Sequence, residues 1–142
     1  MKKDEIKWVV PKYNGIVFHN YLINSNGVLV SKCKHNGSKK KPLFDDYKEI
    51  NPRRSGEGYD YLMPVDVLNK ERKYVATHRL MWESFISPID KGMVIDHINE
   101  DKLDNRITNL RMITQGENIR KHFAYRKKIN NGKTKKIGRA HV

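Results

Sequence analysis

The sequence predicts an α+β fold in which an N-terminal antiparallel β region precedes a strand–loop–helix unit and a basic C-terminal tail. Two short apolar runs flank an Asn-Gly turn near the N-terminus, which is typical of a β-hairpin. A polar loop joins an apolar strand to a capped helix within residues 93–122. The last residues are rich in Lys and Arg and lack acidic side chains. We therefore expect three regions, 1–72, 73–125 and 126–142.

The composition favours a polyanionic partner. The 142 residues carry 29 Lys and Arg against 16 Asp and Glu, a net charge of +13 at pH 7. Neutralising phosphates with such side chains releases counterions and drives binding. The single cysteine, Cys33, permits no intramolecular disulfide and no zinc site built from several cysteines. With no signal peptide and no membrane-spanning stretch evident, we expect a cytoplasmic protein that is not secreted.

The β region is predicted from apolar runs and turn residues. Residues 6–10 form an extended run that Pro11 ends. Residues 21–23 and 28–30 flank the turn Asn-Ser-Asn-Gly at 24–27, so they should pair as a hairpin.

Basic side chains in this region are candidate DNA contacts. Their charges would meet phosphates and give affinity without sequence choice, although a solvated loop is the alternative for the lysine run. We expect residues 44–58, which include two of the arginines, to form a loop. The candidates here are Lys32, Lys34, Lys39, Lys40, Lys41, Arg53 and Arg54.

A second strand pair and a helix should follow. Residues 58–63 and 73–76 look like paired strands with a turn at 69–72. Thr77 can cap a helix over 78–86, which has an apolar face of Leu80, Met81 and Phe85. His78 lies beside that face, so we interpret it as a buried, hydrogen-bonded structural residue.

The strand–loop–helix unit brings chemistry-bearing residues together. Asp96 and His97 end the apolar run 93–95, and a loop rich in Asn and Asp follows. Thr114 can accept from the first turn of the next helix while Glu117 reaches back to the Thr114 amide, which is the capping-box pattern. Asn118 and His122 are four positions apart, so they share one face of that helix.

These residue types suit metal-dependent phosphodiester hydrolysis. Mg²⁺ prefers oxygen ligands such as the Asp96 carboxylate and the Asn118 carbonyl oxygen. A neutral His97 can take a proton from the attacking water near pH 7. His122 could approach the scissile phosphate from one turn further on, or it could be a solvated helix residue, and both interpretations stay open.

The same stretch resembles the ββα-metal motif of HNH (His-Me finger) endonucleases, in the form found in phage and intron homing enzymes. The match rests on Asp96-His97, on Asn109-Leu110 and on the run Asn-Leu-Arg-x-x-Thr-x-x-x-Asn over 109–118. An upstream His78-Arg79-Leu80 leading to Phe85 also fits the pattern. Residues 21–31 resemble the NUMOD-type DNA-binding module that often precedes such units.

The resemblance implies a role for each matching residue. It makes Asp96 and Asn118 the ligands of one divalent cation, Mg²⁺ or Mn²⁺, per active site. It makes His97 the general base, and Asn109 the loop anchor that orients His97 through hydrogen bonds. Asn118 stands where many members have a third histidine, and this Asn form is known in the homing branch.

The C-terminal stretch should add basic contacts. Residues 119–142 hold nine Lys or Arg and no acid. We expect the helix to end at Asn130-Asn131-Gly132, with a disordered arm beyond it that orders on a polyanion. The candidate DNA contacts in and around the unit are Arg111, Arg120 and Lys121.

Together these patterns predict a DNA endonuclease of the HNH homing type that cuts duplex DNA to a 5′-phosphate and a 3′-hydroxyl. One active site per chain should nick as a monomer, while a double-strand break needs a weak homodimer or two events. The alternatives are a basic DNA-binding protein with the same fold and no cleavage, and an RNA-binding or ribosome-associated protein. The last leaves the spacing from residue 96 to 118 unexplained.

Overall fold

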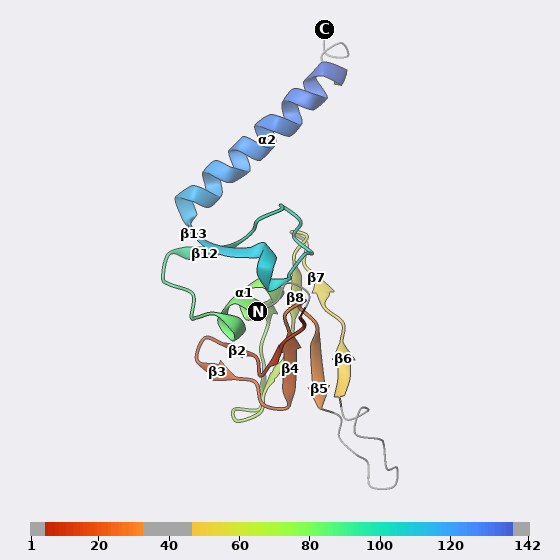
Figure 1. The fold of residues 1–142 in the computed structure, drawn as a ribbon, viewed down its shortest axis with the longest axis vertical. Helices are drawn as coiled ribbons and strands as arrows, with labels where there is room; N and C mark the ends of the chain where they lie inside the picture. The colour runs from red at the N-terminus through yellow and green to blue at the C-terminus, as the bar shows by residue number, and fades with distance from the viewer. Residues whose placement is uncertain (1–4, 33–46, 138–142) are drawn as a thin grey trace.

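The computed structural model describes residues 5–32 and 47–137, with only the helical backbone described for 125 and 129–137. A body of short strands surrounds one helix, and a second, long helix projects away from that body (Figure 1). The α+β class is therefore confirmed. Within the described residues, no helix is long and apolar enough to cross a membrane.

A four-stranded antiparallel sheet forms the N-terminal part, in the order β1-β4-β5-β6. The predicted hairpin is confirmed, with Ile23 opposite Leu29. Its turn is held by Asn24, whose Oδ1 accepts from the Asn26 and Val28 amides at 3.0 and 2.9 Å. The strands are β1 (Trp8–Val9), β4 (Tyr21–Asn24), β5 (Leu29–Lys32) and β6 (Tyr47–Ile50).

A small hairpin fastens this region to the first helix. It consists of β2 (Lys12–Tyr13) and β3 (Ile16–Val17). The Lys12 amide donates to Ser84 Oγ at 3.1 Å, and the Asn14 amide donates to Glu83 Oε1 at 2.9 Å. Because Glu83 is buried on the helix, this bond satisfies a carboxylate oxygen that water reaches poorly.

A three-stranded sheet, ordered β11-β8-β7, confirms the expected pairing of the two strands around residues 58–76. The expected turn between them instead holds a further hairpin, because β9 and β10 pair with each other. Our prediction of a loop over 44–58 is wrong for residues 47–50 and 53–54, where β6 pairs with β5 and β7 with β8. The strands are β7 (Arg53–Arg54), β8 (Asp60–Leu62), β9 (Val65–Asp66), β10 (Glu71–Arg72) and β11 (Val75–Ala76).

Helix α1 (Thr77–Phe85) supplies the centre of the core. The helix is predicted correctly but its cap is not, because Ala76 takes the cap position and Thr77 Oγ1 is buried without a partner. Leu80 and Met81 are fully buried, as their spacing predicts. The core cluster contains residues from both of the expected regions 1–72 and 73–125. Its members are Phe18, Ile23, Leu29, Leu62, Val75, Leu80, Met81, Ile95 and Leu110.

The strand–loop–helix unit contains a second strand between its loop and its helix. Strand β12 (Met93–His97) pairs in antiparallel register with β13 (Leu110–Thr114), and helix α2 (Gln115–Ile137) follows directly. The Glu117 amide donates to Thr114 Oγ1 at 3.1 Å, which confirms the helix start. Glu117 Oε1 accepts from the same hydroxyl at 3.1 Å instead of reaching the Thr114 amide.

The predicted end of α2 at Asn130-Asn131-Gly132 is wrong. The helix continues through these residues to Ile137. Asn and Gly lower helix propensity by up to about 1 kcal/mol each, a cost that neighbouring helix-forming residues can offset. The basic segment after residue 119 therefore lies on one continuous helix as far as the structure describes its backbone (Figure 1).

Candidate active site

The four residues that we singled out for chemistry meet in one small cleft. Asp96 and His97 at the end of β12 line it together with Asn118 and His122 of α2. The cleft has a volume of about 40 Å³. Strand pairing sets the carboxylate and imidazole in place, since Asp96 lies opposite Arg111 and His97 opposite Leu110.

The His97 ring is held in one orientation by Asn105. His97 is only 4% exposed as a residue, and its Nε2 lies 2.8 Å from Asn105 Oδ1. A carbonyl oxygen only accepts, so in the neutral ring Nε2 carries the hydrogen and Nδ1 keeps its lone pair. Nδ1 makes no hydrogen bond within the described residues, so it is the nitrogen that can accept a proton from water.

This finding corrects the role expected for Asn109. Its side chain does not bond to the His97 ring, because Asn105 takes that place. Asn109 Nδ2 donates to Asn99 Oδ1 and to the Asp104 carbonyl, both at 2.9 Å, and its Oδ1 accepts from the Asn99 amide at 3.1 Å. Asn109 therefore closes the loop that carries Asn105, one step removed from the imidazole.

The turn of the N-terminal hairpin supports the same loop. The Ile107 amide donates to the Ser25 carbonyl at 2.9 Å. Gly27 has φ +91°, and a Cβ there would lie 3.3 Å from the Cβ of Asn105. The positive φ therefore favours glycine, and a side chain there would also crowd Asn105. The sequence indicates this Gly for the turn and gives no signal for its close approach to Asn105.

Two cationic side chains converge on Asp96. Its Oδ2 accepts from Arg111 Nε at 3.0 Å and from Lys121 Nζ at 2.6 Å. Asp96 is 8% exposed, so these partners satisfy a carboxylate that the fold largely removes from water. We had expected Arg111 and Lys121 to contact DNA, and the structure engages both with this acid.

Three lining residues had escaped the sequence argument. Tyr59, Glu100 and Lys102 also border the cleft. Lys102 ties the loop to the β7–β8 turn, because its Nζ donates to the Glu57 carbonyl at 3.0 Å and lies 4.6 Å from the centre of the Tyr59 ring. Glu100 and Lys102 stand in a visibly polar loop. Tyr59 lies far upstream and carries no comparable sequence signal.

A ring cluster forms the wall behind His97. The centroid of His78 lies 4.9 Å from that of His97 and 5.2 Å from that of Tyr59. Burial, then the neighbouring His97 and Arg79, lowers the pKa of His78 to about 3, so this ring is neutral near pH 7. Burial, followed by three nearby acids, raises the pKa of Tyr59, so its phenol keeps its proton. The expected partner of His78 is not found, because its Nδ1 is buried without a hydrogen bond.

The donor set fits a hard cation better than zinc. In the described residues, no three His, Cys, Asp or Glu side chains are grouped as a metal site. Asp96, Asn118 and Glu100 nevertheless line one cleft, and the Lys121 ammonium lies against the carboxylates of Asp96 and Glu100. Mg²⁺ and Mn²⁺ need few protein ligands, since they keep several waters.

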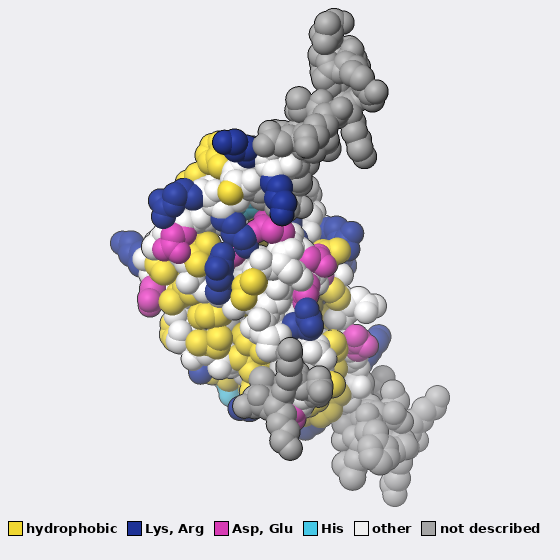
Figure 2. Space-filling view, turned by 45° about the horizontal axis from the view of Figure 1, so that its top comes forward, with side chains coloured by type: hydrophobic (Ala, Val, Ile, Leu, Met, Phe, Trp, Pro, Cys, Tyr) yellow, Lys and Arg dark blue, Asp and Glu magenta, His cyan; other side chains and the backbone are white. Residues whose placement is uncertain are grey.

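The other basic candidates lie apart from this cleft. Arg53, Arg54 and Arg120 are exposed, and Lys32 ends β5. Figure 2 shows Lys and Arg side chains spread over one face with acidic side chains among them. Four candidates lie outside the described residues: Lys34, Lys39, Lys40 and Lys41.

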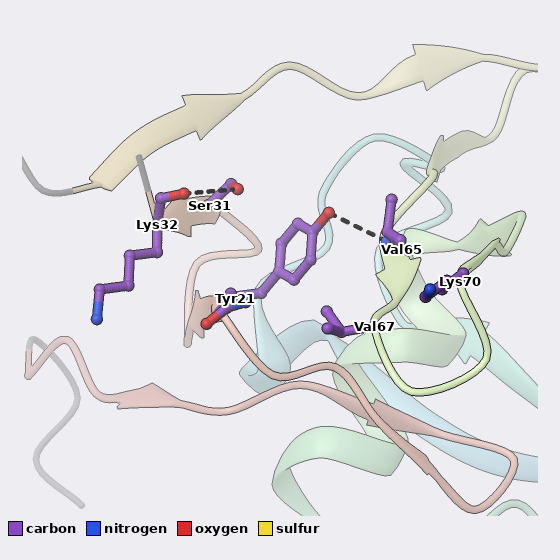
Figure 3. A pocket seen from close by; sticks show the side chains of 7 residues that line it. Tyr21, Ser31, Lys32, Val65, Val67 and Lys70 are labelled. Atoms are coloured by element: carbon purple, nitrogen blue, oxygen red, sulfur yellow. Dashed lines mark hydrogen bonds between the residues drawn. The ribbon is translucent and has the colours of Figure 1, made fainter. Parts of the chain in front are cut away.

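Lys32 also borders a larger hollow of about 640 Å³ between β5 and the β9–β10 hairpin. Figure 3 shows Tyr21 reaching across it, where its hydroxyl accepts from the Val65 amide at 3.0 Å. Lys70 lines the hollow as well. The two ammonium groups could meet phosphates, while the described lining holds no acid, histidine or cysteine for catalysis.

Comparison with known proteins finds similarity to HNH endonucleases. Residues 75–120 match the family model described as HNH endonuclease. An uncharacterized HNH endonuclease of Acanthamoeba polyphaga mimivirus is 29% identical over 126 residues, which cover 87% of this chain and 34% of that protein. A second mimivirus protein of the same description is 36% identical over 85 residues, covering 54% of this chain and 21% of that protein.

A bacterial relative and a solved structure agree with this match. YosQ of Bacillus subtilis (strain 168), named as an SPbeta prophage-derived HNH homing endonuclease, is 46% identical over 98 residues, or 69% of this chain and 49% of that protein. The chain thus spans less than half the length of these curated relatives. The HNH homing endonuclease I-HmuI has the same fold, with a TM-score of 0.61 and 22% identity over 91% of this chain and 67% of that chain. The NUMOD-like character of residues 21–31 stays a prediction.

Proposed function

Because residues 75–120 carry an HNH endonuclease unit, we propose that the protein is a metal-dependent endonuclease that hydrolyses phosphodiester bonds in duplex DNA. The observation that supports this best is the convergence of Asp96, His97, Asn118 and His122 on one cleft. The solved structure of I-HmuI concerns DNA binding and cleavage, and the prophage relative is named a homing endonuclease. We assign a homing-type role to this chain on that basis.

In the proposed reaction His97 is the general base. Its Nδ1 takes a proton from the attacking water, while Asn105 steadies the imidazolium through Nε2–H. The water oxygen bonds to phosphorus and the bond to the 3′-oxygen breaks, which leaves a 5′-phosphate and, after protonation by solvent, a 3′-hydroxyl. The neutral His78 behind the ring adds no competing positive charge.

Asp96 and Asn118 would hold the divalent cation, Mg²⁺ or Mn²⁺. When bound, such a cation supplies charge stabilisation to the phosphate and to the leaving oxygen. His122 lines the same cleft on the face of α2 that carries Asn118, and in this proposal it would approach a phosphate bound there. One cleft per chain serves one strand, so a monomer should nick, and a weak homodimer would be needed for a concerted double-strand break.

A second candidate has one observation in its favour. The pairing of Asp96 with both Arg111 and Lys121 would suit a cytoplasmic DNA-binding protein in which the acid only supports the fold. Such a protein would bind duplex DNA equally well with EDTA and after His97→Ala.

A nicking assay separates the two candidates. The substrate is a supercoiled plasmid library with random inserts, so that a missing target site cannot explain a negative result. We expect open-circle product with Mg²⁺ or Mn²⁺, none with EDTA, and a loss of about 10²- to 10⁴-fold in rate for His97→Ala. His19→Ala is the matched control, because His19 is an exposed histidine of the N-terminal region. Intact plasmid in all lanes, with duplex binding retained, would establish the binding protein instead.

A further inference from the structure

Lys121 lies against Asp96, one of the two proposed metal ligands. It is three residues beyond Asn118 on α2, and its side chain is 20% exposed. Its Nζ lies 2.6 Å from Asp96 Oδ2, 2.8 Å from the His97 carbonyl and 2.5 Å from Glu100 Oε1. The Ile98 carbonyl follows at 3.4 Å. One ammonium is thus surrounded by oxygens from two carboxylates and two peptide groups.

Such a cage is the kind of environment that a hard cation selects. Carboxylate and carbonyl oxygens are the ligands of Mg²⁺, and Asp96 Oδ2 is the oxygen on which Lys121 already lies. Two like charges repel strongly at contact distance in a partly buried site. An ammonium and a divalent cation on this oxygen therefore oppose one another, and more strongly than the ammonium and the singly charged, delocalised Arg111 guanidinium that share it here.

Arg111 is not an equivalent occupant. It donates to Asp96 from the paired strand β13, and its side chain is 48% exposed. It makes no other ion pair or hydrogen bond through its side chain within the described residues. Lysine also has a compact charge on a flexible four-carbon stem, which suits movement between a cage and solvent.

We propose that Lys121 is a built-in cation of the metal site, which fills the oxygen cage in the metal-free protein and leaves it when a divalent cation binds. This inference rests on the proposed function. Its consequence is a competition: part of the metal's binding free energy is spent on displacing the ammonium, so the metal affinity of the wild-type protein is lower than its oxygens alone would give.

The direct test measures metal binding without DNA. The 142-residue protein is titrated with Mn²⁺, and free Mn²⁺ is followed by electron paramagnetic resonance. Lys121→Met keeps the length of the stem and removes the charge, so it should bind Mn²⁺ about tenfold tighter than wild type. Lys127→Met is the matched control, because Lys127 is an exposed lysine of the same helix and its loss changes only the net charge. Lys121→Gln serves as a second variant if the methionine form does not fold.

A second readout follows the lysine itself in the wild-type protein. The rate at which an amine-acylating reagent modifies Lys121, measured by peptide mass spectrometry, should rise several-fold when Mn²⁺ saturates the protein. The rate at Lys127 should stay constant. Continued protection of Lys121 at saturating Mn²⁺ would overturn the displacement.

The two proposals fail in different ways. Suppose Mn²⁺ binds to wild type but not to Asp96→Asn, and Lys121→Met binds no tighter than Lys127→Met. The proposal that Lys121 competes with the metal is then wrong, while the proposed metal site at Asp96 is retained. If no variant binds Mn²⁺ through Asp96, both proposals fall together. Weaker binding by Lys121→Met would likewise exclude competition.

Discussion

The body of the protein and the loop over residues 98–109 are stabilised in different ways. The body has an apolar core in which Leu80, Met81 and Ile23 are fully buried. The loop, in contrast, is held by side-chain hydrogen bonds of Asn and Asp residues. Two of these side chains are buried: Asn105, which bonds to the His97 ring, and Asn109, which bonds to the Asp104 carbonyl. Apolar burial is non-directional, whereas hydrogen bonds require particular distances and angles.

The difference shows which part of the structure must fix side-chain orientation closely. An apolar core supplies most of the free energy of folding but tolerates changes of shape. A ring that must accept a proton needs a fixed orientation, and the Asn105 carbonyl provides it for His97. We therefore expect changes in the core to act on global stability, and changes in the loop to act on local order and activity.

The largest effect is expected for Leu80→Ala. The side chain is fully buried in the cluster shared by the β region and the β12–β13 pair, so its loss leaves a cavity. The free energy of unfolding should fall by about 2–5 kcal/mol, measured by urea denaturation. A drop in activity without this loss of stability would break the comparison.

Asn109→Ala should come next. It removes the three hydrogen bonds of a buried side chain, which costs roughly 1–3 kcal/mol. Hydrogen exchange should accelerate at the Asn99 amide far more than in β4 and β5, while nicking slows. Asn69→Ala, which removes an exposed Asn bonded to Asp66, is the control. Equal acceleration across the whole body would show that the loop is not a separate unit.

Acid should destabilise the protein through His78. Its pKa is about 3 when folded and 6.5 ordinarily, so between these values the unfolded chain binds the extra proton. The contribution of His78 to the free energy of unfolding is thus retained above pH 6.5 and lost as the pH falls towards 3. From pH 6.5 to about pH 5.5 the wild type should lose roughly 1 kcal/mol more than His78→Phe, by urea denaturation at each pH. Parallel losses in both proteins would refute it.

The smallest effect is expected at the start of α2. Thr114→Ala removes the acceptor of the Glu117 amide and should cost roughly 0.5 kcal/mol, at the low end for a cap because the site is exposed. Thr114→Ser keeps the hydroxyl and should match wild type. If the alanine variant loses as much as Leu80→Ala, the projecting helix contributes more to the body than its contacts suggest.

Local patterns were sufficient for much of the fold and the site. The hairpin at 21–32, the start of α2 at Thr114 and the apolar face of α1 were predicted, because turn residues, caps and periodicity act over a few neighbouring residues. Spacing and resemblance also chose Asp96, His97, Asn118 and His122, which the fold brings to one cleft.

Tertiary structure decided the rest, because the deciding partners lie far apart along the chain. Strand β6 has two charged residues among its four and β7 is Arg-Arg, so both form by pairing with β5 and β8, which no local propensity specifies. Asn105 and Asn109 look alike in a loop of turn formers, and only folding assigns one to the His97 ring and the other to loop closure. Likewise Lys121 is one of many lysines in sequence, and its cage of oxygens exists only once α2 lies against the end of β12.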